Sequence, residues 1–254
     1  MKLFDLHCDT AYELYKTNSS ILTNELAVSL ENYRDYDNKA QVFAIWSDKD
    51  KTDDECYLAF QRIAANLREQ IDKNAELVTK CVDSKTLEAA DNKLCAILGV
   101  EDARLLAGDL SRLERLYENG VRVITLCWKG KTCIGGAFDT DDGLTDFGFE
   151  VLSECEKMGI TVDVSHMSQK SFWDVASKAT KPFIASHSNS FSICPHPRNL
   201  TDTQYRTIIS AGGVVGISLA GAHLSATLAD TKGPGIITPE HVQECVCQHI
   251  MHFL

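Results

Sequence analysis

The sequence predicts an α/β fold of the TIM (β/α)8-barrel type. Short apolar runs alternate with amphipathic segments along the whole chain, which is the pattern of parallel strands covered by helices. The chain has 254 residues, and eight strand–helix units typically occupy about 250 residues. We find no internal repeat and no linker, so we expect a single domain over residues 1–254.

Seven apolar runs have the length and composition of buried strands, at residues 2–9, 41–47, 94–101, 121–128, 160–165, 182–187 and 213–219. Helical patterns lie between them at 54–71, 110–119, 147–158 and 201–211. Gly120 and Gly159 follow two of these helices as stop signals, and Thr238-Pro239-Glu240 opens a last helix. The chain ends inside that helix, so we expect the eighth strand to be missing and the barrel to be C-terminally incomplete.

The composition argues against several classes of function. The net charge is −11, and no stripe of Lys or Arg is present to neutralise phosphates, so we expect no nucleic-acid or membrane partner. The first ten residues lack the apolar run of a signal peptide, and no stretch is long enough to span a bilayer. We therefore expect a cytoplasmic protein. Its ten scattered cysteines are expected to be reduced and mostly buried.

The first predicted strand ends in a pair of metal-binding residue types. His7 and Asp9 are two positions apart, so both side chains point to the same face of the strand. Imidazole nitrogen and carboxylate oxygen are suitable ligands for a divalent ion. Many metal-dependent hydrolases bind their first ion with His-x-Asp at the C-terminal end of the first barrel strand. By itself the tripeptide arises often by chance.

The same kind of residue recurs where other predicted strands end, at Glu101, His166 and His187. A lone histidine at a strand end is more often a hydrogen-bonded polar group than a ligand. In a TIM barrel, however, all these ends meet at one mouth, where catalysis occurs. Together with His7 and Asp9 they suit two divalent ions, with Glu101 able to bridge them. We expect the remaining histidines to be surface or partly buried residues; these are His196, His223, His241, His249 and His252.

Six motifs along the chain together resemble the membrane (renal) dipeptidase family of zinc peptidases, and in particular its bacterial members. They are DLHCDT at 5–10, GVE at 99–101, GLTDFG at 143–148, DVSHMS at 163–168, SHS at 186–188 and RNL at 198–200. The resemblance implies that His7 and Asp9 hold one zinc, that His166 and His187 hold the other, and that Glu101 bridges both. Glu101 and Asp9 are the implied catalytic residues, and other divalent metals are open alternatives.

The resemblance also implies a substrate site. Arg198 would bind the substrate carboxylate, because a guanidinium pairs bidentately with a carboxylate; the alternative is a surface ion pair. Trp128 stands where renal-type members have a histidine, and it either lines the substrate pocket or fills the barrel rim. The family's aspartate motif on the eighth strand has no counterpart here.

The function implied by the resemblance is hydrolysis of dipeptides by a hydroxide that bridges two divalent metal ions. The substrate partner would be a dipeptide, and a homodimer is compatible with the resemblance. Two alternatives stay open. One is another binuclear amidohydrolase, such as a lactonase or a phosphotriesterase-like enzyme, although those commonly begin with His-x-His. The other is a non-catalytic or inactive metal-binding barrel fragment.

Overall fold

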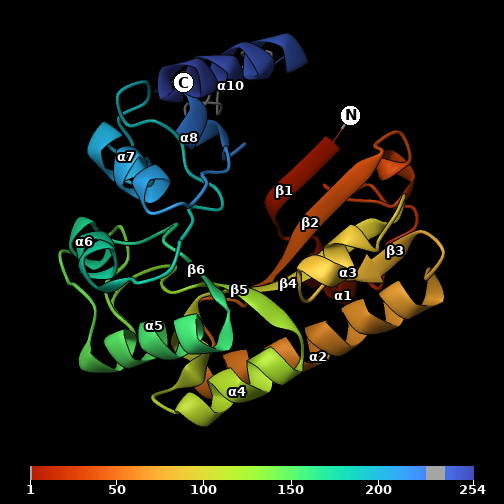
Figure 1. Cartoon of the computed structure of the whole chain (residues 1–254), viewed down its shortest axis with the longest axis horizontal. Helices are drawn as coiled ribbons and strands as arrows, with labels where there is room; N and C mark the ends of the chain where they lie inside the picture. The colour runs from red at the N-terminus through yellow and green to blue at the C-terminus, as the bar shows by residue number, and fades with distance from the viewer. Residues whose placement is uncertain (1, 227–237) are drawn as a thin grey trace.

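The computed structural model describes residues 2–226 and 238–254, and its centre is a curved parallel sheet (Figure 1). The described strands run in the order β1-β2-β4-β5-β6, and β3 pairs with the first half of β4. Their bounds are Lys2–Cys8 for β1, Asn38–Ile45 for β2, Val78–Lys80 for β3, Leu94–Glu101 for β4, Val121–Thr125 for β5 and Thr161–Asp163 for β6. All the pairings between them are parallel.

Helices follow the strands, and α2, α4 and α5 cover the outer face of the sheet (Figure 1). The α-helices are α1 (Thr10–Thr17), α2 (Asp53–Lys73), α3 (Ser84–Glu88), α4 (Leu110–Glu118), α5 (Asp146–Met158), α6 (Gln169–Lys178), α7 (Asp202–Ser210), α8 (Gly221–Leu224) and α10 (Pro239–Phe253), and the 3-10 helices are η1 (Glu31–Tyr33) and η2 (Ala103–Leu106). The main hydrophobic core lies between sheet and helices. None of the helices in the described ranges has the length and hydropathy of a bilayer-spanning segment.

Beyond β6, two segments extend the sheet without forming regular strands. Residues 182–187 and 213–219, both predicted as strands, make single parallel bridges, Asp163 to Ile184 and Ala185 to Val215. Backbone hydrogen bonds continue along them, from the amide of Gly216 to the carbonyl of Ala185 and from the amide of Ser188 to the carbonyl of Gly216. A Cβ atom on Gly216 would lie 2.1 Å from the carbonyl oxygen of Ser186, so only glycine permits this approach.

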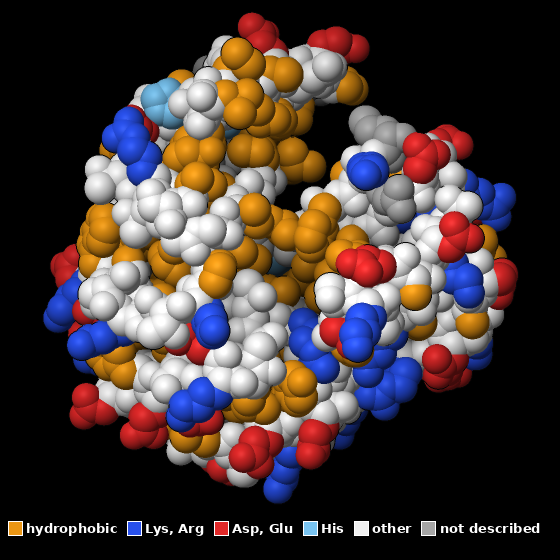
Figure 2. Space-filling view, in the orientation of Figure 1, with side chains coloured by type: hydrophobic (Ala, Val, Ile, Leu, Met, Phe, Trp, Pro, Cys, Tyr) orange, Lys and Arg blue, Asp and Glu red, His pale blue; other side chains and the backbone are white. Residues whose placement is uncertain are grey.

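The sheet and its extension form a half-barrel, in agreement with the predicted α/β barrel class. β1 is an edge strand in the described part of the chain, bonded to β2 on one side. Figure 2 shows the surface hollowed between the α8–α10 region and the β1 region, with hydrophobic side chains around the hollow. Phe4 on β1, and Val214 and Leu219 on the segment 213–219, are exposed hydrophobic residues.

The cysteines agree with the expectation of reduced thiols. All ten are unpaired, and eight of them are buried; Cys133 is partly buried and Cys247 is exposed. Burial raises the pKa of Cys8 and Cys155 to about 12, which keeps these thiols protonated and unreactive.

One sequence-based expectation, that His249 is a surface or partly buried residue, is wrong. Its side chain is 0% exposed and lies between α10, α8 and the loop after residue 187. The Nδ1 atom accepts a hydrogen bond from the amide of Ser190 at 3.1 Å, and Nε2 donates to the carbonyl of Leu224 at 2.9 Å. The apolar pattern of α10 does not reveal this, because both partners lie far away in the sequence.

We predict that His249→Ala lowers the free energy of unfolding by about 2–4 kcal/mol, because two buried backbone groups lose their partners. Denaturation in urea, followed by circular dichroism, measures this change. His241→Ala is the matched control, since His241 lies exposed on the same helix and its loss should change stability by less than about 0.5 kcal/mol. Equal losses in the two variants would contradict the role of His249.

Candidate metal centre

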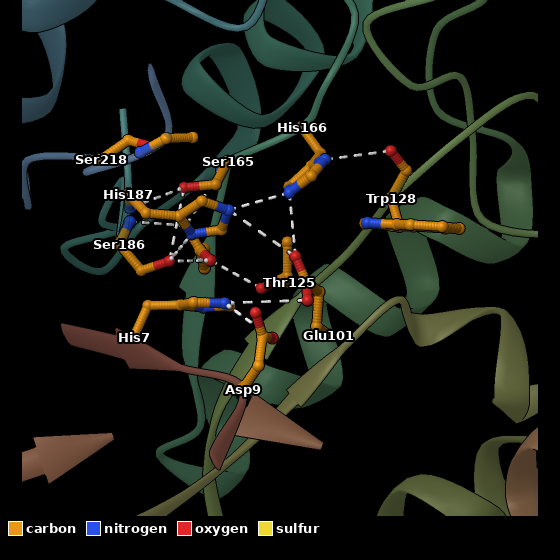
Figure 3. Close-up of polar contacts among 12 residues, drawn as sticks. His7, Asp9, Glu101, Thr125, Trp128, Ser165, His166, Ser186, His187 and Ser218 are labelled. Atoms are coloured by element: carbon orange, nitrogen blue, oxygen red, sulfur yellow. Dashed lines mark hydrogen bonds and ion pairs between the residues drawn. The ribbon is translucent and has the colours of Figure 1, made fainter. Parts of the chain in front are cut away.

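Four strand-end residues meet at the C-terminal edge of the sheet (Figure 3). His7 lies near the end of β1, Glu101 is the last residue of β4, His166 follows β6, and His187 ends the segment 182–187. Figure 3 shows the three imidazoles pointing toward the carboxylate of Glu101. Ligand atoms of His7, Glu101 and His187 all lie within 4.8 Å of one another, close enough to hold one metal ion. The predicted convergence of these residues is therefore present.

The Glu101 carboxylate is the centre of this cluster. Oε1 lies 2.9 Å from Nε2 of His166 and 3.6 Å from Nε2 of His187. Oε2 lies 3.7 Å from Nε2 of His7. Each carboxylate oxygen thus lies near a histidine, Oε2 near His7 and Oε1 near His166 and His187.

The donor atoms fit a divalent cation. Nε2 of His166 and Nε2 of His187 are 2.8 Å apart, and at most one proton can lie between them. Nδ1 of His166 lies 3.1 Å from the carbonyl oxygen of Trp128, which can only accept, so Nδ1 carries the hydrogen and Nε2 presents a lone pair. Lone pairs and a carboxylate that converge this closely are stabilised by a cation among them.

The electrostatics of the cluster favour the protonation states that metal ligands need. Burial raises the pKa of Glu101, but His7, His166 and Arg198 outweigh it and hold the pKa at about 2. Burial, with the neighbouring His7 and His166, holds the pKa of His187 well below its usual value. Burial also lowers the pKa of His166. At neutral pH, Glu101 is therefore ionised and these two imidazoles are neutral.

His7 is the exception, because carboxylates face it from two sides. Burial lowers its pKa, but Glu101 and Asp9 outweigh this and raise it to about 9. Oδ1 of Asp9 lies 3.5 Å from Nε2 of His7, and the Asp9 side chain is 55% exposed. The structure thus brings Asp9 to the solvent-facing rim of the cluster and not to its centre.

Arg198 is buried in the same cavity without an ion-pair partner in the described residues. Its Nε and Nη2 atoms have no hydrogen-bond partner there, and its guanidinium lies 5.7 Å from the centre of the Phe138 ring. Burial lowers its pKa to about 10 even though Glu101 raises it, so the side chain stays charged. The alternative of a surface ion pair is therefore wrong. A buried, unpaired guanidinium is suited to receiving an anion.

The cavity at the cluster has a volume of about 540 Å³ and is lined by both aromatic and basic side chains. Trp128 is one of the aromatic residues, and it stacks on Trp46 at 6.2 Å between ring centres. Arg198 and His223 are the basic residues beside the metal-cluster histidines. Burial and Arg198 lower the pKa of His223 to about 3, so its imidazole is neutral, and Nδ1 lies 2.9 Å from Oγ of Ser218.

Sequence reasoning missed Trp46 and His223 as cavity residues. Trp46 directly follows β2, so its strand-end position was the available signal. His223 belongs to the short helix α8, and no pattern in the sequence places that helix beside Arg198.

Comparison with known proteins gives a family match over the whole chain. A model of the membrane dipeptidase family, peptidase family M19, matches residues 1–254. An uncharacterized protein from the pqqA 5′ region of Klebsiella pneumoniae is 35% identical over 179 residues, which cover 66% of each chain. An uncharacterized dipeptidase of Schizosaccharomyces pombe is 31% identical over 166 residues, which cover 59% of this chain and 40% of the relative. The matched stretches thus cover 40% to 66% of the length of these two relatives.

Solved structures share the fold. A metallopeptidase from Rhodobacter sphaeroides, bound to a phosphinate mimic of the dipeptide L-Ala-D-Ala, matches with a TM-score of 0.87 and 23% identity over 100% of this chain and 82% of its own. A dipeptidase of family M19 matches with a TM-score of 0.87 and 24% identity over 100% of this chain and 80% of its own. The probable dipeptidase PvdM from Pseudomonas aeruginosa matches with a TM-score of 0.74 and 18% identity, over 96% and 77%.

We predict that Glu101→Gln weakens zinc binding by more than about 100-fold, because a neutral amide is a much weaker ligand for a divalent cation than a carboxylate and loss of an outer hydrogen-bond partner alone costs up to about that much. Zinc content after dialysis and a competition titration with a chromogenic chelator measure the effect. Glu13→Gln is the control, since Glu13 lines the same cavity without contacting the histidines of the cluster. Unchanged zinc loading of Glu101→Gln would contradict the assignment.

Proposed function

The chain belongs to the membrane dipeptidase family of peptidases, and on that premise we propose that it hydrolyses dipeptides with two divalent metal ions, zinc in the first instance, held around Glu101. The observation that carries the proposal is the pairing, in one cavity, of a buried carboxylate near three histidines with a buried arginine that has no anionic partner among the described residues.

In this proposal, His7 and Asp9 hold one ion, His166 and His187 hold the other, and Glu101 bridges both. Bound divalent ions would lower the pKa of water toward neutrality and polarise the scissile carbonyl. Glu101 and Asp9 are the carboxylates that contact the cluster histidines. Asp9 is the more exposed of the two, so we assign to it the handling of the proton that the attacking water gives up.

Arg198 would fix the orientation of the substrate. A terminal carboxylate pairs bidentately with a guanidinium, and the low polarity around a buried guanidinium strengthens the pair. With the carboxylate at Arg198 and the amide bond at Glu101, the N-terminal residue would extend toward the wall formed by Trp46 and Trp128. Trp128 would thus line the substrate site, as the sequence-based hypothesis allows.

The alternatives receive less support. A lactonase or phosphotriesterase-like enzyme has no need of an unpaired buried arginine for a free carboxylate, and the family match points to peptidases. A non-catalytic metal-binding barrel would keep the cluster but has no use for the charged wall of the cavity. Homodimer formation and a cytoplasmic location remain predictions.

We predict that the zinc-loaded protein hydrolyses dipeptides that have a free C-terminal carboxylate and is far less active on the matching dipeptide amides. A panel of both substrate types, with release of free amino acids as readout, tests this. Lactones and phosphotriesters in the same panel serve as controls. Turnover of those controls but not of dipeptides would favour the amidohydrolase alternative, whereas zinc binding without any turnover would favour the non-catalytic one.

We predict that Arg198→Met lowers kcat/KM for dipeptides by at least about 30-fold, because loss of a buried charge partner costs about 2–5 kcal/mol. Steady-state kinetics measures the loss. Arg206→Met is the control, as Arg206 is exposed on α7. The preference for dipeptides over their amides should disappear in Arg198→Met, and a variant that kept this preference would show that another group binds the carboxylate.

A further inference from the structure

Behind His187 lies a second carboxylate, Asp163, which does not enter the proposed function. It is the last residue of β6, and its side chain is 0% exposed. Oδ1 accepts hydrogen bonds from the amides of Ser165 at 2.9 Å and Ser186 at 2.8 Å. Oδ2 accepts from the hydroxyls of Thr125 and Ser186, both at 2.6 Å. Asp163 thus joins the ends of β5, β6 and the segment 182–187.

Ser186 continues this network to the metal cluster. Its Oγ atom lies 2.6 Å from Oδ2 of Asp163 and 2.7 Å from Nδ1 of His187. A serine hydroxyl has one hydrogen, and an ionised carboxylate can only accept. The hydrogen of Ser186 therefore goes to Asp163, and the contact with His187 requires a hydrogen on Nδ1.

This assignment of hydrogens determines the tautomer of the His187 imidazole. A neutral ring with its hydrogen on Nδ1 presents a lone pair at Nε2, the atom that faces Glu101 and His166. His166 has the same tautomer for a different reason, because its Nδ1 atom donates to the backbone carbonyl of Trp128. The two histidines thus present Nε2 to the same point, one held by the main chain and the other by a pair of side chains.

We propose that Asp163 is a positioning residue, which acts through the hydroxyl of Ser186 to hold His187 in the Nδ1–H form with Nε2 directed at the metal cluster. The proposal rests on the proposed metal site but concerns a contact behind it. Hydrogen-bond acceptors of this kind orient ligand histidines and raise their basicity, and losing them weakens metal binding by about 10- to 100-fold.

Two substitutions separate this role from a structural one. Ser186→Ala removes the link to His187, whereas Thr125→Val removes a hydroxyl with the same 2.6 Å bond to the same carboxylate oxygen but with no contact to a cluster histidine. Both residues are buried, so both variants should lose stability. Only Ser186→Ala should weaken zinc binding, by about 10- to 100-fold in a chelator competition.

The substitution Asp163→Asn should reverse the tautomer of the His187 imidazole. The amide nitrogen of an asparagine can donate to Oγ of Ser186, which frees the serine hydrogen for Nδ1 of His187 and moves the ring hydrogen to Nε2. Nitrogen-15 chemical shifts of the histidine rings distinguish the two tautomers in the metal-free protein. We expect the Nδ1–H form of His187 in the wild type and the Nε2–H form in Asp163→Asn.

The wild-type measurement decides the proposal even where a variant fails to fold. An Nε2–H tautomer of His187 in the wild type, or equal zinc affinities of Ser186→Ala and Thr125→Val, would overturn it. A protein with His187 in the Nδ1–H form but no affinity for zinc would instead contradict the proposed metal site while supporting the positioning contact. The two failures are therefore distinguishable.

Discussion

The architecture of the site depends on one buried charge, the carboxylate of Glu101. Removing a carboxylate from water is unfavourable unless positive or polar groups surround it. Here the surrounding groups come from separate parts of the chain, His7, His166, His187 and Arg198. Glu101 itself ends β4, which is the only described strand that pairs with three others. The most firmly held strand thus carries the group whose position matters most.

The strand pattern in the sequence predicts most of the fold. β4 has the predicted bounds, because residues 94–100 form an uninterrupted apolar run that ends at Glu101. β1 and β2 differ from prediction by a few residues. β5 and β6 are shorter than predicted and end at Thr125 and Asp163, although the amides of Leu126 and Val164 still bond to neighbouring segments. β3 was missed, as Val78–Lys80 is too short for a periodic signal. Residues 182–187 and 213–219 lie in the predicted places but form bridges only.

The cluster residues could be predicted because they share one recognisable position, the end of an apolar strand. The residues that surround the cluster could not be predicted in this way. Asp163 and Ser186 were visible within the family motifs, but the pattern does not say that their side chains touch each other and His187. His223 and His249 owe their surroundings to how α8 and α10 pack, which depends on contacts between distant segments. Sequence periodicity carries no information on such contacts.

The open edge of β1 affects how the metal cluster is held. Elements with fewer hydrogen bonds open locally at lower free energy than the rest of a protein. β1 is bonded on one side in the described part of the chain, and it carries His7, whereas β4, with Glu101, is bonded on both sides. Fraying of β1 would remove one side of the cluster while the other side stays assembled. Within the described part of the chain, His7 is therefore held to the cluster by an edge strand, whereas Glu101 is held by a strand that is paired on both sides.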